Sequence, residues 1–242
     1  MRVLWVTGFL DSPSREAEPF WLAVTGTTLS GRRGGGAFAT LLPADGDACL
    51  RVQVIGASEK PKAHVDLHVA DVPAAAGEAR ALGAAEVFAE EGLVVLRSPA
   101  GVLFCLVAWG GQSERPEPVR WPGGQASVVD QLSLDIPARD YDAEMAFWAE
   151  LTGWERRASD LPGFAFLQGD ASLPMRFLLQ RIGSGAAGVH LDLACDGVDA
   201  EVERHVGLGA SVVRRVPGDW TTLRDPLGRE YCVTGRAPRG RG

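Results

Sequence analysis

Two of the four histidines in this 242-residue chain open closely similar stretches. His64 begins HVDLHVAD and His190 begins HLDLACD. In a β-strand, residues two apart point to the same face, so we expect Asp66 to accompany His64 and Asp192 to accompany His190. An imidazole beside a carboxylate can bind a metal, act as a general base, or form a hydrogen-bonded pair in a core. The residue types alone leave all three roles open.

The two histidine stretches belong to a duplicated sequence. Landmarks 127 residues apart are Phe20-Trp21 and Phe147-Trp148, Thr25-Gly26 and Thr152-Gly153, and Gly101 and Gly228. A constant offset over separate landmarks predicts two copies of one domain, over 1–110 and 127–236. Residues 111–126 are rich in Gly, Pro and charge, which is typical of a linker, and we expect a disordered tail over 237–242.

Each copy divides again into two similar modules. A strand-like stretch leads into a helical pattern, and two or three short β-type runs follow. The helical patterns, which end at or near a glycine as many helices do, cover 14–26, 73–84, 140–153 and 199–210. We therefore predict a β-α-β-β-(β) unit repeated four times. On the third helix, Met145, Phe147-Trp148 and Leu151 share a packing face, and on the fourth we expect His205 at the surface.

Composition excludes several classes of protein. Apolar residues make up 46% of the chain and charged residues 23%, as in an ordinary globular protein, and the net charge is −7. This acidic balance argues against nucleic-acid binding. No window approaches the roughly 20 apolar residues of a membrane span, and the apolar start is too short for a secretion signal. The four cysteines lack CxxC spacing and lie in apolar runs; we expect buried, reduced thiols and a cytoplasmic location.

The duplicated stretches resemble the vicinal oxygen chelate superfamily, which includes glyoxalase I, extradiol dioxygenases and bleomycin-resistance proteins. The resemblance rests on the HxxLxVxD-type starts, on helices ending in LGA (82–84 and 208–210), and on DPLGREYC (225–232) with its weaker twin SPAGVLFC (98–105). Within this superfamily, the chain is similar in particular to tandem glyoxalase-like proteins. The resemblance implies an α+β fold of two tandem domains, each of two paired βαβββ modules forming a cup-shaped, mostly antiparallel sheet around a ligand site.

The same resemblance implies four metal-ligand positions in each copy, one on the first and one on the last strand of each module. In the C-terminal copy these positions hold Gln131, Gln180, His190 and Cys232, and in the N-terminal copy they hold Leu4, Gln53, His64 and Cys105. Neither set contains a carboxylate, whereas Fe, Mn, Ni and Mg sites of this kind need imidazole with anionic oxygen. We therefore expect no cofactor, and a divalent metal at His190 is the less favoured alternative.

The remaining cup residues suggest how a ligand would be held. By strand alternation Ser133 accompanies Gln131, and Glu230 accompanies Cys232. Trp220 is a candidate for an apolar wall. In a catalytic version, His190 or Glu230 would be the general base and Asp192 would tune the imidazole. The alternative is structural: the polar face is solvated, or its His and Asp satisfy each other.

We predict a metal-independent, glyoxalase-like protein that binds or sequesters an apolar or aromatic metabolite or an antibiotic, as a monomer or homodimer. The alternative is a metal-dependent or acid-base enzyme of the lyase, isomerase or dioxygenase type, with its site in the C-terminal cup. A third possibility is that one copy is purely structural. The candidate catalytic residues are His190, Asp192 and Glu230. The candidate ligand-binding residues are Gln131, Ser133, Gln180, Cys232, Trp220, His64, Asp66 and Gln53.

Overall fold

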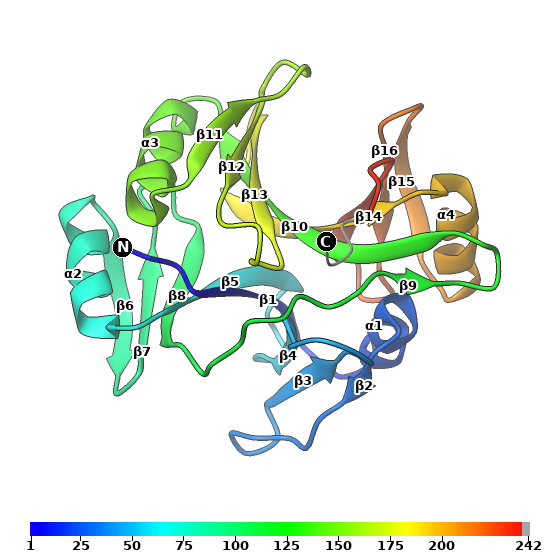
Figure 1. Ribbon diagram of the computed structural model, residues 1–242, viewed down its shortest axis with the longest axis horizontal. Helices are drawn as coiled ribbons and strands as arrows, with labels where there is room; N and C mark the ends of the chain where they lie inside the picture. The colour runs from blue at the N-terminus through cyan, green and yellow to red at the C-terminus, as the bar shows by residue number, and fades with distance from the viewer. Residues whose placement is uncertain (239–242) are drawn as a thin grey trace. The chain divides into compact units, whose positions relative to one another are not determined.

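The computed structural model describes residues 1–238, so positions 239–242 of the expected tail lie outside the described residues. Within that range the strands form two sheets (Figure 1). The first runs, in spatial order, β2 (Thr28–Leu29), β3 (Phe38–Leu42), β4 (Leu50–Val54), β1 (Trp5–Ser12), β5 (Lys62–Val69), β8 (Leu103–Ala108), β7 (Leu93–Arg97) and β6 (Ala85–Glu90). The second runs β11 (Glu155–Ala158), β12 (Phe164–Gln168), β13 (Arg176–Ile182), β10 (Ala126–Pro137), β14 (Gly188–Cys195), β17 (Glu230–Thr234), β16 (Trp220–Arg224) and β15 (Ser211–Val216), with β9 (Val119–Arg120) paired to β10.

The two strand orders are the same when β1–β8 are matched with β10–β17, and this match confirms the predicted duplication. The helices are α1 (Glu18–Thr25), α2 (Val72–Ala81), α3 (Tyr141–Thr152) and α4 (Val198–Gly207), one in each expected module. Gly26 and Gly153 end α1 and α3 with φ of 64° and 68°. Glycine adopts this left-handed conformation at no steric cost, which explains why TG recurs at the constant offset. The α+β fold of four modules is therefore confirmed. No helix in the described part of the chain combines the length and apolarity needed to span a bilayer.

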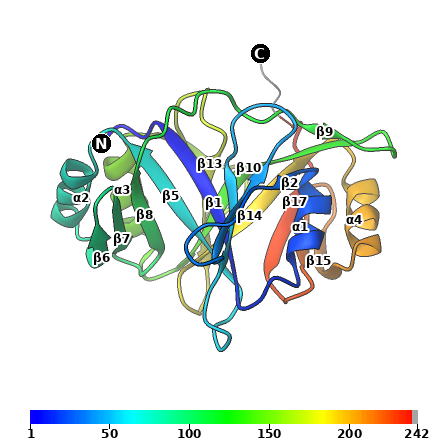
Figure 2. The same cartoon turned by 90° about the horizontal axis from the view of Figure 1, so that it is seen from below.

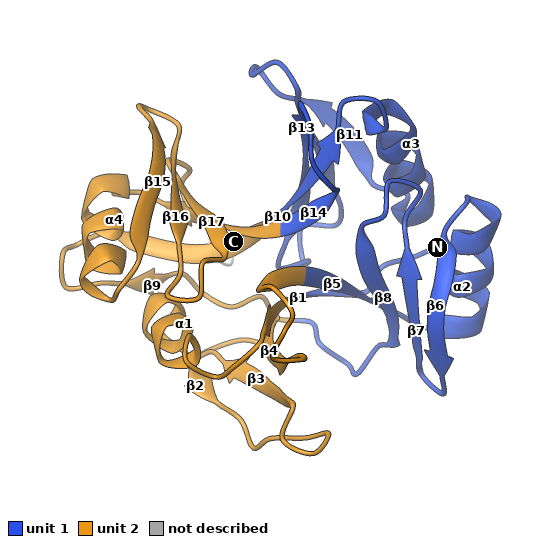
Figure 3. Cartoon of the chain, turned by 180° about the vertical axis from the view of Figure 1, so that it is seen from behind, with its two compact units in different colours: residues 1–8, 64–113, 132–189 blue, residues 9–63, 114–131, 190–242 orange. Residues whose placement is uncertain are grey.

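The chain also divides into two compact units, coloured separately in Figure 3. Unit 1 comprises residues 1–8, 64–113 and 132–189, and unit 2 comprises residues 9–63, 114–131 and 190 onward. Unit 1 therefore contains α2 and α3, and unit 2 contains α1 and α4. Each unit thus takes one helix-bearing module from each sequence copy.

In unit 1, α3 packs its aromatic face on β8 and β13. The ring centroid of Trp148 lies 5.0 Å from that of Phe104 and 5.4 Å from that of Phe177. The face predicted from the sequence is buried as expected. Glu144, also fully buried, accepts hydrogen bonds from the Trp148 indole Nε1 (2.7 Å) and the Ala100 amide (2.8 Å). The buried indole N–H is thereby paired, as such a donor must be to avoid a desolvation cost.

In unit 2, α1 packs beside β17 (Figure 2). The Trp21 ring lies 5.0 Å from that of Tyr231, and its Nε1 donates to Asp225 Oδ2 at 2.9 Å. The Arg229 guanidinium lies 3.0 Å from the same carboxylate oxygen and donates to Ser12 Oγ at 2.7 Å. The buried carboxylate is therefore paired with a buried cation, without which it would be costly to bury.

The expectation that His205 lies on the surface is wrong, because its side chain is fully buried. Its Nδ1 lies 3.0 Å from the Tyr231 hydroxyl and its Nε2 lies 3.1 Å from Glu201 Oε1, one turn earlier on α4. Burial lowers the pKa of His205 despite the nearby carboxylate, so the ring is neutral at pH 7. The helical pattern correctly predicted that His205 lies on α4. The ring can be buried there because two buried polar partners satisfy its nitrogens and offset the desolvation cost.

A pH-dependent contribution to stability is expected from Glu144. Burial raises the pKa of its carboxyl, so the folded state favours the protonated form. Its favourable contribution is complete below the unfolded pKa, near 4.5, and is lost as pH rises through the higher folded pKa. Glu144→Gln cannot ionise, and we expect the free energy of unfolding of the wild type to fall relative to this variant between pH 4.5 and 8 in urea titrations.

The matched control is Glu150→Gln, because Glu150 is exposed on the same helix. This variant should follow the wild-type pH dependence. Parallel pH profiles for Glu144→Gln and the wild type would show that the Glu144 carboxyl has the same pKa in both states.

Candidate functional site

The first and last strands of two modules pair in parallel. In the pairing of β5 with β8, Asp66 lies opposite Cys105, and in that of β14 with β17, Asp192 lies opposite Cys232. Paired residues share a face of the sheet, and so does the residue two positions earlier on the same strand. The topology therefore brings a histidine, an aspartate and a cysteine together in each sheet.

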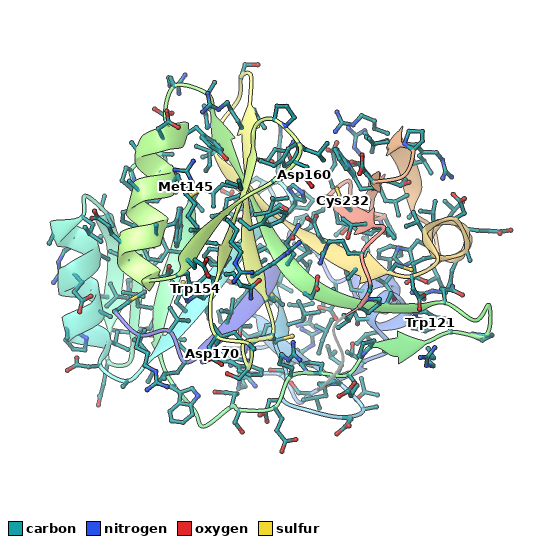
Figure 4. All side chains as sticks on the ribbon, turned by 45° about the horizontal axis from the view of Figure 1, so that its top comes forward. Trp121, Met145, Trp154, Asp160, Asp170 and Cys232 are labelled. Atoms are coloured by element: carbon teal, nitrogen blue, oxygen red, sulfur yellow. The ribbon has the colours of Figure 1, made fainter. Side chains whose placement is uncertain are left out.

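The unit 2 cluster consists of His190, Asp192 and Cys232, the last of which is labelled in Figure 4. His190 Nε2 lies 3.2 Å from Asp192 Oδ1 and 3.9 Å from Cys232 Sγ. One nitrogen, one carboxylate oxygen and the sulfur all lie within 4.8 Å of one another. The three donor atoms thus converge on one region instead of forming a chain.

Neighbouring side chains hold this cluster in place. Gln131, itself buried, donates from Nε2 to Asp192 Oδ2. Thr222 Oγ1 lies 3.4 Å from Cys232 Sγ. Burial raises the pKa of the Cys232 thiol, and the negative charge of Asp192 raises it further. The cysteine is therefore a neutral thiol at pH 7.

The unit 1 cluster, His64, Asp66 and Cys105, has the same composition and is more deeply buried. His64 Nε2 lies 3.5 Å from Asp66 Oδ1, and burial raises the pKa of Cys105 to about 11. The His64 side chain is 7% exposed, against 15% for His190. The unit 2 cluster is thus the more accessible of the two, and its histidine is the accessible group.

The other predicted site residues lie at several places. Glu230 is exposed and forms an ion pair with Arg224 at 2.7 Å, so it does not join the cluster although it shares a strand with Cys232. Trp220 is partly buried, with the Arg214 guanidinium 5.5 Å from its ring centroid. The structure therefore offers Glu230 no part in the cluster chemistry as folded.

The three remaining candidates are placed by their strands. Ser133 is fully buried on β10, Gln180 lies on β13 opposite Phe164, and Gln53 lies on β4 opposite Phe38. Both glutamines are partly exposed, in contrast to Gln131. Among the three glutamines predicted to line the cups, Gln131 is thus the one that donates a hydrogen bond to a cluster residue, Asp192.

Two further residues contribute to the clusters. Cys105 completes the unit 1 cluster; it holds a family ligand position in the sequence but was not among the ligand-binding candidates. Thr222 contacts the Cys232 thiol because β16 pairs with β17 in a register that sets these two residues opposite each other. The sequence carries no signal for that cross-strand register.

The geometry does not fit a cysteine nucleophile activated through histidine. In such a relay the imidazole contacts the nucleophile with one ring nitrogen and the carboxylate with the other. Here both Asp192 and Cys232 approach Nε2 of His190, and the thiol pKa is raised. The arrangement instead suits a single point that all three donors could contact, such as a cation or one polar atom of a ligand.

The donor set also decides which metals would fit. Mn²⁺ and Mg²⁺ prefer oxygen donors and Fe²⁺ sites use two imidazoles with a carboxylate, whereas the unit 2 cluster offers one nitrogen, one oxygen and one sulfur. Zn²⁺ accepts all three donor types, with a fourth position left open in catalytic sites. The four family positions supplied no carboxylate, but Asp192, which is not one of them, supplies one. A zinc-type ion therefore fits these residues better than the hard divalent ions do.

Comparison with known proteins identifies the family. A family model for the glyoxalase-like domain matches residues 9–107 and 131–234, once in each sequence copy. The chain belongs to this family. The two matched segments contain both histidine clusters. A search of curated protein sequences finds no match.

Solved structures similar to this glyoxalase-like chain share its fold at low sequence identity. A Mn(II)-bound glyoxalase from Novosphingobium aromaticivorans is 16% identical, with a TM-score of 0.66 over 99% of this chain and 84% of that one. An extradiol ring-cleaving dioxygenase from B. fuscum is 13% identical, with a TM-score of 0.68 over 99% and 73%. The 2,3-dioxygenase LapB from Pseudomonas sp. KL28 is 14% identical, with a TM-score of 0.66 over 100% and 95%. These likenesses establish the tandem vicinal oxygen chelate fold.

The role of Gln131 in holding Asp192 can be tested by stability. Gln131→Leu removes the donor and leaves a buried carboxylate oxygen with one partner fewer, which should lower the free energy of unfolding by about 1–3 kcal/mol. Gln180→Leu is the matched control, because Gln180 is partly exposed, and it should cost less than half as much in chemical denaturation. Equal losses for the two variants would mean that the hydrogen bond to Asp192 contributes nothing measurable.

Proposed function

We propose that the chain is a glyoxalase-like binding protein that holds an apolar or aromatic small molecule at the unit 2 cluster without a metal ion. His190 supplies the polar contact, and Asp192 orients its imidazole. In this proposal the protein binds or sequesters a metabolite or an antibiotic. The unit 1 cluster has the same three residue types, but its histidine is less accessible to a ligand. In this proposal its role is structural.

The observation that carries this proposal is the combination of access and local pairing at His190. Its side chain is 15% exposed, while Asp192 beside it is 3% exposed and receives the Gln131 amide. The Cys232 thiol contacts both His190 and Thr222. The buried members are thus hydrogen-bonded within the protein, and the imidazole edge is left as the group that a ligand can reach.

Titration calorimetry with catechol, in the presence of EDTA, tests this proposal. Catechol is a suitable aromatic probe because catechol dioxygenases of known structure share the fold. We expect saturable binding by the wild type, and a loss of about tenfold in affinity in His190→Ala, since one hydrogen bond to a ligand contributes roughly 1–2 kcal/mol.

His64→Ala is the matched control, because it removes the equivalent histidine from the more buried cluster, and catechol affinity should be unchanged. Binding that is abolished by EDTA would contradict the metal-independent proposal. Binding that is unaffected by His190→Ala would exclude the unit 2 cluster as the site.

The convergence of three donor atoms favours a second candidate, a zinc-type enzyme of lyase, isomerase or oxidoreductase chemistry. His190, Asp192 and Cys232 would hold the ion, which when bound supplies a Lewis acid that polarises a substrate oxygen. Gln131 would keep the Asp192 carboxylate oriented toward the ion, as outer hydrogen bonds do in metal sites.

Elemental analysis after purification, followed by Zn²⁺ titration of the dialysed protein, separates the two candidates. The second candidate requires one tightly held ion per chain, lost in His190→Ala and retained in His64→Ala. An ion that survives His190→Ala would be located elsewhere. A protein that takes up no Zn²⁺, Mn²⁺ or Fe²⁺ would remove the enzyme candidate and leave the binding proposal.

A further inference from the structure

Unit 2 contains a cavity that is lined by none of the three residues of its histidine cluster. Its volume is about 220 Å³, and Leu193 is one of its lining residues. Leu193 follows Asp192 directly on β14, so the two side chains point to opposite faces of the strand. The cavity is therefore distinct from the site discussed above.

The walls of this cavity are mainly apolar and come from several elements. Val24 at the end of α1, Leu41 on β3, Leu50 on β4 and Val129 on β10 line it together with Leu193. An engineered apolar cavity of about 150 Å³ can hold a benzene molecule. A cavity of this size therefore accommodates one aromatic ring with a short side chain.

The charged groups that line the cavity are both acidic. Asp45 and Glu117 contribute carboxylates, and Glu117 lies in the segment that precedes β9. Among the described residues that line it there is no Lys, Arg or His. A ligand that is complementary to this cavity carries a positive charge, because a carboxylate ligand would meet like charge in a partly desolvated space.

A third acceptor lies on the inner wall. Ser127 Oγ donates to the buried Glu201 Oε1 at 2.6 Å and accepts from Trp121 Nε1 at 2.9 Å, which leaves its second lone pair for a donor from a ligand. Burial alone would raise the pKa of Glu201, but hydrogen bonds from His205, Arg204 and Ser127 together hold it well below its usual range. Ser127, which is among the residues that line the cavity, is therefore committed as a donor to Glu201 and can offer a ligand only a hydrogen-bond acceptor.

Arg204, which contacts Glu201 behind Ser127, is a positive group whose charge is already paired. Arg204 contacts Glu201 at 2.7 Å and donates to the carbonyls of Ala23 and Val24, which end α1. Its guanidinium also lies 3.5 Å from the ring centroid of Trp121. The Arg204 guanidinium is thus engaged by the α1 carbonyls, the Glu201 carboxylate and the Trp121 ring. Arg204 does not line the cavity.

We propose that this cavity is a binding site for a small apolar amine. The ring or alkyl part would contact the valine and leucine walls, and the ammonium group would lie toward Glu117, Asp45 and Ser127. This site does not depend on a ligand or a metal at the histidine cluster.

Calorimetric titration with 2-phenylethylamine tests the proposal, with 3-phenylpropionate as the probe of similar shape and opposite charge. We expect saturable binding of the amine and an affinity for the acid at least about tenfold weaker, from repulsion by the two carboxylates. Glu117→Gln should weaken amine binding about fivefold, as expected for loss of one partly solvated ion pair. Equal affinity for both probes, or none for the amine, would overturn the proposal.

Location is tested by filling the cavity. Thr27→Trp places a large side chain at a partly exposed lining position, and Ala44→Trp does so at an exposed one. Each variant, checked by its thermal transition, should abolish binding of 2-phenylethylamine, and His190→Ala should leave it unchanged. Amine binding that persists in both folded tryptophan variants, or that is lost in His190→Ala, would place the amine elsewhere and overturn the proposal.

Discussion

The parallel pairing of the first and last strands of a module is the constraint on which the candidate site depends. Parallel neighbours cannot be joined by a tight turn, so the chain must leave β14, form α4, β15 and β16, and return as β17. That excursion sets Asp192 opposite Cys232. The histidine cluster therefore exists only when the whole module is folded, and the same holds for β5 and β8 with their own cluster.

A second constraint is the buried indole. Trp21 and Trp148 occupy equivalent positions in the two copies, and each indole N–H must find an acceptor when it is buried. In unit 1 the acceptor is Glu144 on the helix itself, whereas in unit 2 it is Asp225 in the turn before β17, balanced by Arg229. The copies have thus diverged to different solutions of one hydrogen-bonding requirement, which makes the two helix-docking surfaces chemically distinct.

The unit 1 and unit 2 clusters contain the same three residue types and differ in how deeply the histidine is buried. Both hold a histidine, an aspartate and a cysteine whose donor atoms converge. The difference is that His190 retains twice the exposed fraction of His64, and that Asp192 receives a glutamine amide. A polar group contributes to recognition only if a ligand can reach it, so access assigns the functional role to the unit 2 cluster in our proposal.

The sequence by itself determined the duplication, the four modules, the positions of the helices and the pairing of each histidine with the aspartate two residues later. These features follow from periodicity along one strand or helix and from a constant offset, which are properties of the chain order. Tertiary structure alone decided that Gln131 contacts Asp192, that Glu230 turns to Arg224, and that His205 is buried against Tyr231. Strand alternation says which residues share a face, but the partner opposite each of them depends on register between strands distant in sequence, and burial depends on what packs above them.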